Sequence, residues 1–187
     1  MLSKMKMLQS VDDMTAHHGS EMMKEAKPLI ERTMSGPVIM ELHSKKYIND
    51  PLLHYTEKLG KAMIDVVDIL DTMNMKGFES ADTMKMRHLH TMLNHALEMA
   101  AEGSNLAILG HMSKTGEVMD TYSINQGNQM MKNARSLLTA TMGSKTMKEL
   151  HAAGVTTEKD SMMREFHAFA EAAMNVIDML IKMPGMD

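Results

Sequence analysis

The sequence contains no Cys and no Trp, and only three Tyr and three Phe among its 187 residues. The absence of Cys excludes a disulfide framework, thiolate zinc sites, iron–sulfur clusters and a cysteine nucleophile. The few aromatic residues and the formal net charge of −4 leave little for base stacking or phosphate binding, so we expect no nucleic-acid partner. Apolar runs such as 107–109 are three to four residues long, so we expect no membrane span, which requires roughly 18.

The N-terminus also lacks the pattern of a secretory leader. Residues 1–6, MLSKMK, contain no apolar core of the kind that a signal peptide needs. Two interpretations follow, a cytoplasmic protein or a mature periplasmic domain without its leader. Free thiols are a liability in an oxidising compartment, so the absence of Cys favours the periplasm, with the cytoplasm as the alternative.

The residues that are present are typical of helices. Ala, Leu, Met, Lys and Glu dominate, and all are good helix formers, whereas no long segment alternates apolar and polar residues with β-branched enrichment as strands do. Connections of about three to five residues predict an antiparallel up-and-down four-helix bundle over 50–183. Capping and helix-breaking residues divide this region into four segments, 50–76, 80–114, 118–152 and 157–183. The first is expected to begin at Asp50-Pro51, the second at Ser80, and the fourth at the capping-box pattern of Thr157 to Asp160. The third has a candidate break at Gly143-Ser144 and is expected to stop at Gly154.

An additional N-terminal helical hairpin is expected over residues 10–49. Its first helix is predicted from Ser10 to about residue 34, and Pro28 is expected to kink it. A Ser-Gly-Pro segment then separates a shorter helix over 38–48. The length suits one domain, so we predict a single all-α domain over 1–187, in which the hairpin packs on the bundle or contributes to it.

The unusual feature of the composition is 27 Met beside 10 His. Met alone fills irregular space in a core well, so the question is whether Met follows the core stripe of a helix or follows His. The segment 80–114 separates the two patterns. Its core stripe is predicted to consist of residues that share one helical face, namely Met86, Leu89, Leu93 and Leu97.

A second stripe lies roughly 140° from the Leu stripe on the helical wheel. It alternates Met and His at spacings of 4, 4, 3 and 4 residues, so each neighbouring pair is one helical turn apart. Core packing explains the first stripe and leaves the second unexplained. We call the second stripe the Met/His ladder; it consists of Met84, His88, Met92, His95 and Met99.

Other Met and His residues also lie one helical turn apart. The predicted first helix carries a cluster of four candidate ligands on one face, Met14, His17, His18 and Met22. Single pairs occur elsewhere, and chance alone produces many such pairs in a Met-rich chain, so each is more simply a surface or packing His. The remaining candidate ligands are Met40/His43, Met147/His151 and Met163/His167.

The donor set indicates which metal ion would bind. Thioether sulfur is soft and imidazole is borderline, so together they suit Cu(I), with Ag(I) as an analogue, better than Mg²⁺, Ca²⁺ or Mn²⁺. Zinc would need carboxylate or Cys ligands beside His. A di-iron bundle would need Glu-x-x-His on two helices, and no His in the chain is preceded by Glu at that spacing.

Enzyme motifs are missing from the sequence. It has no Gly-rich phosphate loop, no HExxH and no GxSxG, and Gly116, Gly127 and Gly143 are isolated residues that we interpret as helix breaks. We therefore expect no enzymatic activity. Binding of b-type haem by His and Met stays open, because only covalent c-type attachment requires Cys.

Residues 13–26, DMTAHHGSEMMKEA, resemble the opening helix of the CopM-like periplasmic copper-binding proteins. Members of this paired-His family are Met/His-rich four-helix bundles that begin with a paired-His motif. The resemblance carries over to His17, His18 and Met22, and beyond about residue 34 it is one of composition and architecture. It implies Cu(I)/Ag(I) binding, a periplasmic location and a role in copper resistance.

The preferred hypothesis is a Cu(I)/Ag(I)-binding protein that sequesters or carries copper for resistance or homeostasis through several Met/His sites. Its partners would be copper ions and a copper efflux or acceptor protein. One alternative is a holdase-like interaction bundle whose Met-rich surface accommodates apolar helices or unfolded segments. The other alternative is a b-type haem bundle, which would show a Soret absorbance.

Overall fold

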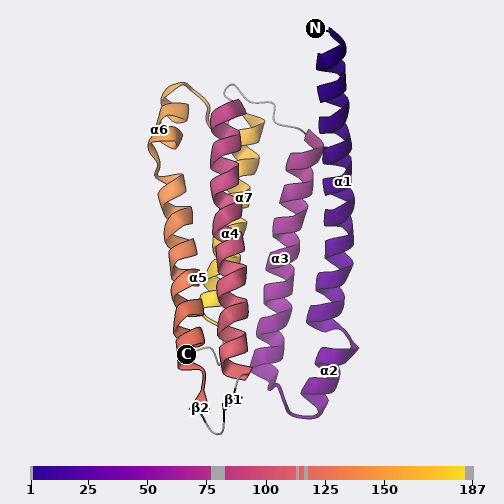
Figure 1. The fold of residues 1–187 in the computed structure, drawn as a ribbon, viewed down its shortest axis with the longest axis vertical. Helices are drawn as coiled ribbons and strands as arrows, with labels where there is room; N and C mark the ends of the chain where they lie inside the picture. The colour runs from indigo at the N-terminus through magenta and orange to yellow at the C-terminus, as the bar shows by residue number, and fades with distance from the viewer. Residues whose placement is uncertain (1, 77–82, 113, 116–117, 184–187) are drawn as a thin grey trace. The chain divides into compact units, whose positions relative to one another are not determined.

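The computed structural model describes residues 2–76, 83–112, 114–115 and 118–183. By its internal contacts the chain divides into two compact units, Met1–Glu79 and Ser80–Asp187, and each is described by itself. Nearly all of the described residues are helical, which confirms the predicted all-helical class (Figure 1). None of the described helices is long and apolar enough to cross a membrane.

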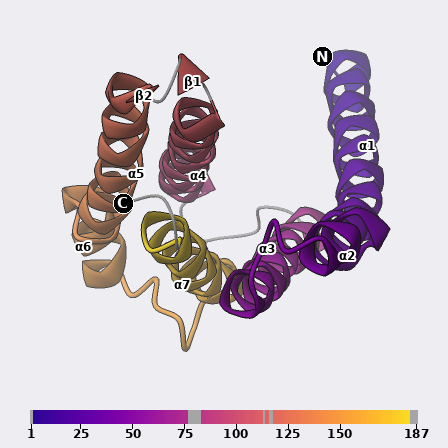
Figure 2. The same cartoon turned by 90° about the horizontal axis from the view of Figure 1, so that it is seen from below.

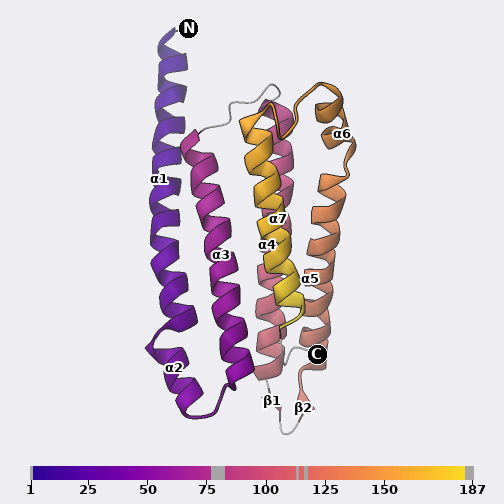
Figure 3. The same cartoon turned by 180° about the vertical axis from the view of Figure 1, so that it is seen from behind.

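The first unit is built on two long helices that run side by side in opposite directions (Figures 1 and 3). Ser20 donates a hydrogen bond of 2.6 Å to Asp71, and Lys27 pairs with Asp68, so polar contacts join the two helices. The three helices of the unit are α1 (Leu2–Ser35), α2 (Pro37–Ser44) and α3 (Asp50–Lys76).

Several predicted boundaries in the first unit are wrong. Helix α1 begins well before Ser10, and Pro28 lies inside it, where the expected kink stays a prediction. Helix α2 ends four residues earlier than expected, and Lys46 just beyond it has a left-handed φ of 60° that a helix does not tolerate. The cap of α3 is Asn49, whose side chain accepts a hydrogen bond of 2.9 Å from the backbone N–H of Leu52.

The sequence pattern predicts that α3 belongs to a four-helix bundle with the later helices. In the structure α3 contacts α1 and α2 within the first unit. The predicted division at residue 49 therefore falls inside a compact unit, and the four-helix bundle over 50–183 stays a prediction. The expected helix start at Ser80 and the break at Gly116 lie outside the described residues.

In the second unit the helices 83–112, 121–142 and 161–181 all contact one another, and Figure 2, which looks along them, shows them side by side. Its largest fully buried side chains include Leu93, Met131, Leu138, Phe166 and Phe169. The helices of the unit are α4 (Thr83–Met112), α5 (Thr121–Met142), α6 (Lys145–Ala152) and α7 (Ser161–Ile181). Between α4 and α5 a short antiparallel pair is formed by β1 (Lys114–Thr115) and β2 (Val118–Met119).

Helices α4 and α5 approach each other closely at two glycines. A Cβ atom at Gly103 would lie 2.7 Å from the carbonyl oxygen of Gly127, and one at Gly127 would lie 2.3 Å from the oxygen of Gly103. The interpretation of Gly127 as a helix break is therefore wrong, because α5 runs through it. Glycine at both positions allows the two backbones to touch.

The turns around α6 follow from local hydrogen bonds. The predicted break at Gly143-Ser144 is confirmed, and the Ser144 hydroxyl accepts from the N–H of Met147 at 3.1 Å, which caps α6. Gly154 takes a φ of +84° in the loop that follows, as a helix stop requires. The predicted cap at Thr157 is wrong, because Asp160 caps α7 by accepting from the N–H of Met163 at 2.8 Å.

Candidate metal sites

The Met/His ladder lies outside the core of the second unit. Met84 is 79% exposed, His88 and His95 are exposed, and Met92 and Met99 are half-buried. On the same helix the predicted core residues Met86, Leu89 and Leu93 are buried. Leu97 is only half-buried, because Ala96 and Ala100 take the buried positions at that level of α4.

Part of the ladder faces a hollow. His88 and Met92 line a cavity of about 160 Å³ together with residues of α5 and the turn after it, among them Thr141 and Ser144. Near this hollow Lys85 of α4 forms an ion pair of 3.3 Å with Glu149 of α6. The cavity therefore places one imidazole and one thioether beside open space, where a small ion could enter.

Further along the ladder, His95 contacts an acid on its own helix. Its Nδ1 lies 3.3 Å from Oε2 of Glu98, one turn away, and both side chains are exposed. An exposed contact of this kind contributes little free energy. It therefore leaves the imidazole available to bind an ion.

His90 lies apart from the ladder and packs against the core. Its ring centroid is 5.3 Å from that of Phe169, and its Nδ1 lies 3.3 Å from the amide nitrogen of Asn94. Burial lowers the pKa of His90, because a charged imidazole would lose its hydration there. This residue has the properties of a packing His.

The two Met/His pairs near the C-terminus come together in the structure. The rings of His151 on α6 and His167 on α7 are nearly parallel, with centroids 6.0 Å apart. Their partners are in the core, since Met147 is 2% and Met163 is 0% exposed. We call His151 and His167 the α6–α7 histidine pair. The helical spacing in the sequence predicts two separate Met/His pairs and does not indicate that the two histidines meet.

His167 is the more buried member of the pair. Its Nε2 is shielded from solvent and has no hydrogen-bond partner within the part of the chain that the structure describes, and the ring meets Phe166 edge-on with centroids 6.2 Å apart. Burial lowers the pKa of His167, the nearby His151 lowers it further, and Glu171 partly opposes both effects. The lowered pKa favours the neutral imidazole, whose ring nitrogen can bind a metal ion.

The paired histidines of α1 face solvent. His17, His18 and Met22 are exposed, whereas Ser20 between them is buried against α3 through its bond to Asp71. The neighbouring Glu21 is paired with Lys24 on the same helix. The side chain of the fourth predicted ligand, Met14, lies outside the described residues.

The candidate pair in α2 is engaged elsewhere. Met40 is half exposed, and Nε2 of His43 contacts Oδ1 of Asp50 at the start of α3. An ion at this pair would have to displace the carboxylate or bind to the other ring nitrogen. The geometry therefore supports this pair less than the ladder.

Over the described ranges no three His, Asp or Glu side chains gather closely enough to hold a metal ion together. A site formed by these residues therefore depends on thioether donors or on two imidazoles with water.

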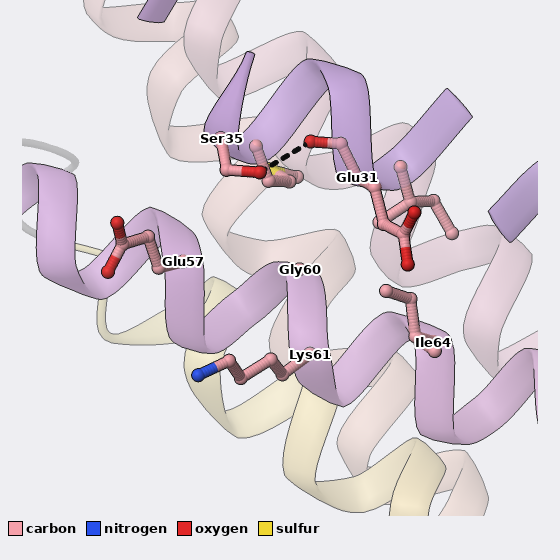
Figure 4. A pocket seen from close by; sticks show the side chains of 8 residues that line it. Glu31, Ser35, Glu57, Gly60, Lys61 and Ile64 are labelled. Carbon is pink, nitrogen blue, oxygen red and sulfur yellow. Dashed lines mark hydrogen bonds between the residues drawn. The ribbon is translucent and has the colours of Figure 1, made fainter. Parts of the chain in front are cut away.

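A larger hollow of about 340 Å³ lies in the first unit, between α1 and α3 (Figure 4). Glu31, Glu57 and Lys61 are among its lining residues, and Ser35 donates a hydrogen bond of 2.8 Å to the backbone oxygen of Glu31. Of the described residues, no His lines this hollow and Met34 supplies the one thioether. Its donors, mainly carboxylates, a hydroxyl and an amine, are unsuited to a soft ion.

No family model, no curated protein and no solved structure matches the chain.

Proposed function

We propose that this protein binds Cu(I), with Ag(I) as an analogue, and that it sequesters or carries copper. The observation that carries the proposal is the position of the ladder. Met84, Met92 and Met99 leave the buried face of α4 and alternate with two exposed histidines at one-turn spacing.

Burial of a Met side chain stabilises a fold by about 1.5–3 kcal/mol relative to leaving it exposed. A Met that is 79% exposed, such as Met84, forgoes most of this contribution. A role as ligand explains the arrangement, because thioether sulfur and imidazole are the donors that Cu(I) accepts. Without thiolates the affinity would be moderate, which suits a protein that must release its ion.

The experiment is a competition titration under reducing, oxygen-free conditions. The protein and a chromogenic Cu(I) chelator compete for the ion, and we expect transfer of more than one equivalent to the protein. The test variant replaces Met84, Met92 and Met99 with Leu, because this exchange nearly preserves volume and removes only the sulfur. The matched control is Met112→Leu, since Met112 is 73% exposed on the same helix but outside the ladder.

The triple variant should lose at least one equivalent of Cu(I) and of Ag(I), whereas the Met112→Leu control should keep the wild-type stoichiometry. His88→Gln with His95→Gln should lower the affinity of the same site. No transfer of Cu(I) from the chelator to the wild-type protein would end the proposal.

A second candidate function has one observation in its favour. Helix α2 buries none of its side chains, and it exposes Val38 at 71% together with Met40 and Leu42. An apolar surface of this kind could bind helices or unfolded segments. If α2 binds such segments directly, replacement of His17, His18, His88 and His95 with Ala should leave this binding intact. Loss of binding in that variant would contradict the second candidate function.

The proposal extends to location and partner. A Cu(I) carrier without Cys suits the periplasm, and it requires a copper efflux or acceptor protein to receive the ion. The resemblance of residues 13–26 to CopM-like proteins supports the same location. Fractionation of the native host, with the protein detected by antibody, tests it.

A further inference from the structure

The α6–α7 histidine pair offers a donor set that differs from the ladder. It consists of two imidazoles on two helices, and the thioethers one turn away belong to the buried Met147 and Met163. We infer that His151 and His167 together bind one divalent ion, with Cu²⁺ as the preferred species.

The separation of the rings fits a shared ion. Imidazole nitrogens bind metal ions at about 2.0–2.1 Å, so two rings on one ion have centroids about 4.5 Å apart in a cis arrangement and about 6.4 Å apart in a trans one. The observed 6.0 Å lies within this range. The rings are nearly parallel without the ion, so binding requires the exposed His151 side chain to rotate until a nitrogen of each ring faces the same ion.

The unpaired nitrogen of His167 supplies a second, independent indication. Its Nε2 is buried and has no partner among the described residues, and a buried polar atom without a partner is unfavourable. A bound ion would provide that partner. The exposed side of the site, at His151, leaves positions for the water ligands that a divalent ion needs.

The preference for Cu²⁺ follows from the donors. Nitrogen sites bind divalent first-row ions in an order that peaks at Cu²⁺, whereas soft monovalent ions gain more from the thioethers of the ladder. The carboxylate of Glu171, which partly opposes the lowering of the His167 pKa by burial and by His151, adds negative charge close to the site. The chain would then bind both oxidation states of copper at separate places.

A shared ion has a mechanical consequence that a single-helix site lacks. It would join α6 to α7 across the loop that contains Gly154. Because only the folded chain brings the two rings together, an ion at 100 times its dissociation constant should lower the unfolding constant of the second unit by about 100-fold.

The experiment uses the metal-free full chain and Cu²⁺ without a reductant. Affinity is measured by calorimetry, the ligand atoms by electron paramagnetic resonance, and stability by urea denaturation with and without Cu²⁺. His151→Gln and His167→Gln are the test variants. His54→Gln is the control, because His54 is exposed on α3 and its Nδ1 lies 3.8 Å from Oε2 of Glu57, away from both paired histidines in the chain.

We expect two-nitrogen coupling in the wild-type spectrum. Each test variant removes one imidazole ligand and should lose affinity by about tenfold or more, whereas the control should not change. Stabilisation by Cu²⁺ should disappear in both test variants. His151 is exposed, so its variant should fold even if the His167 variant does not.

Unchanged affinity and stabilisation in His151→Gln would overturn the inference and would leave water as the partner of the buried nitrogen. The inference does not depend on the proposed function. Titration of the same variants with Ag(I) separates the two, because the ladder should keep its Ag(I) when the histidine pair is removed, and the pair should keep Cu²⁺ when the ladder is removed.

Discussion

Replacement of Gly127 by Ala should destabilise the second unit by about 2 kcal/mol. The new Cβ would lie 2.3 Å from the carbonyl oxygen of Gly103 and 2.6 Å from the backbone nitrogen of Ala107. Both atoms belong to the backbone of α4 and cannot rotate away, so α4 and α5 must move apart by about 1 Å to reach ordinary contact distance.

The magnitude is the difference between two effects. Overpacking of this kind costs about 1–3 kcal/mol, and contact with backbone on the facing helix places it near the upper limit. Exchange of Gly for Ala inside a helix returns about 1 kcal/mol through propensity. The net loss of about 2 kcal/mol should lower the urea midpoint by about 1 M, for an m value of about 2 kcal/mol/M.

The assay is urea denaturation followed by the helical circular dichroism signal, with Gly143→Ala as the matched control. A Cβ at Gly143 would meet nothing closer than 3.6 Å, so this variant should stay within about 0.5 kcal/mol of wild type. If Gly127→Ala were as stable as wild type, the close approach of the two helices would be refuted.

Three further outcomes follow from the same structure. Since burial lowers the pKa of His90 below its unfolded value near 6.5, the metal-free protein should lose stability as the pH falls below about 6.5, and His90→Gln should reduce this loss in denaturation curves taken between pH 7 and 5. Asp160→Ala should remove the cap of α7 and cost about 1 kcal/mol in the same assay, whereas an unchanged midpoint would argue against the bond to Met163. Peroxide should oxidise Met84 and Met112 before the buried Met163, and Ag(I) should protect Met84 but leave Met112 reactive in peptide mass spectra; equal protection of both would contradict binding at the ladder.

The parts of the fold that depend on local sequence were predictable. Met86, Leu89 and Leu93 mark the buried face of α4 by their spacing, and the separate stripe that begins at Met84 followed from the same helical period. The break at Gly143 was predictable because Ser144 is a strong N-cap residue. These features need no knowledge of which helices are neighbours.

Features that depend on contacts between helices were not predictable. In the sequence Gly127 is an isolated glycine of the kind that breaks a helix. Only its close approach to Gly103 on the facing helix explains a glycine at this position inside α5. The meeting of His151 with His167 likewise depends on the path of the loop between their helices. A Met/His signal within each helix could mark the candidates but could not show which of them meet.

At Asp160 two local signals compete. The Thr157 to Asp160 pattern has the form of a capping box, yet the helix begins later because the Asp160 side chain bonds to the N–H of Met163. Sequence patterns of this kind locate the end of a helix to within a few residues and leave its exact cap open.

The odd number of donors on the ladder has a consequence for its occupancy. If each ion takes two consecutive donors, the five residues hold two ions and one donor remains vacant. The vacancy can fall at Met84, at Met92 or at Met99, which gives three arrangements of equal occupancy. An ion that releases one donor and takes the vacant neighbour converts one arrangement into the next, so the bound ions can shift along α4 without leaving it. In every one of these arrangements His88 and His95 are bound to an ion, and only the methionine that remains unbound changes.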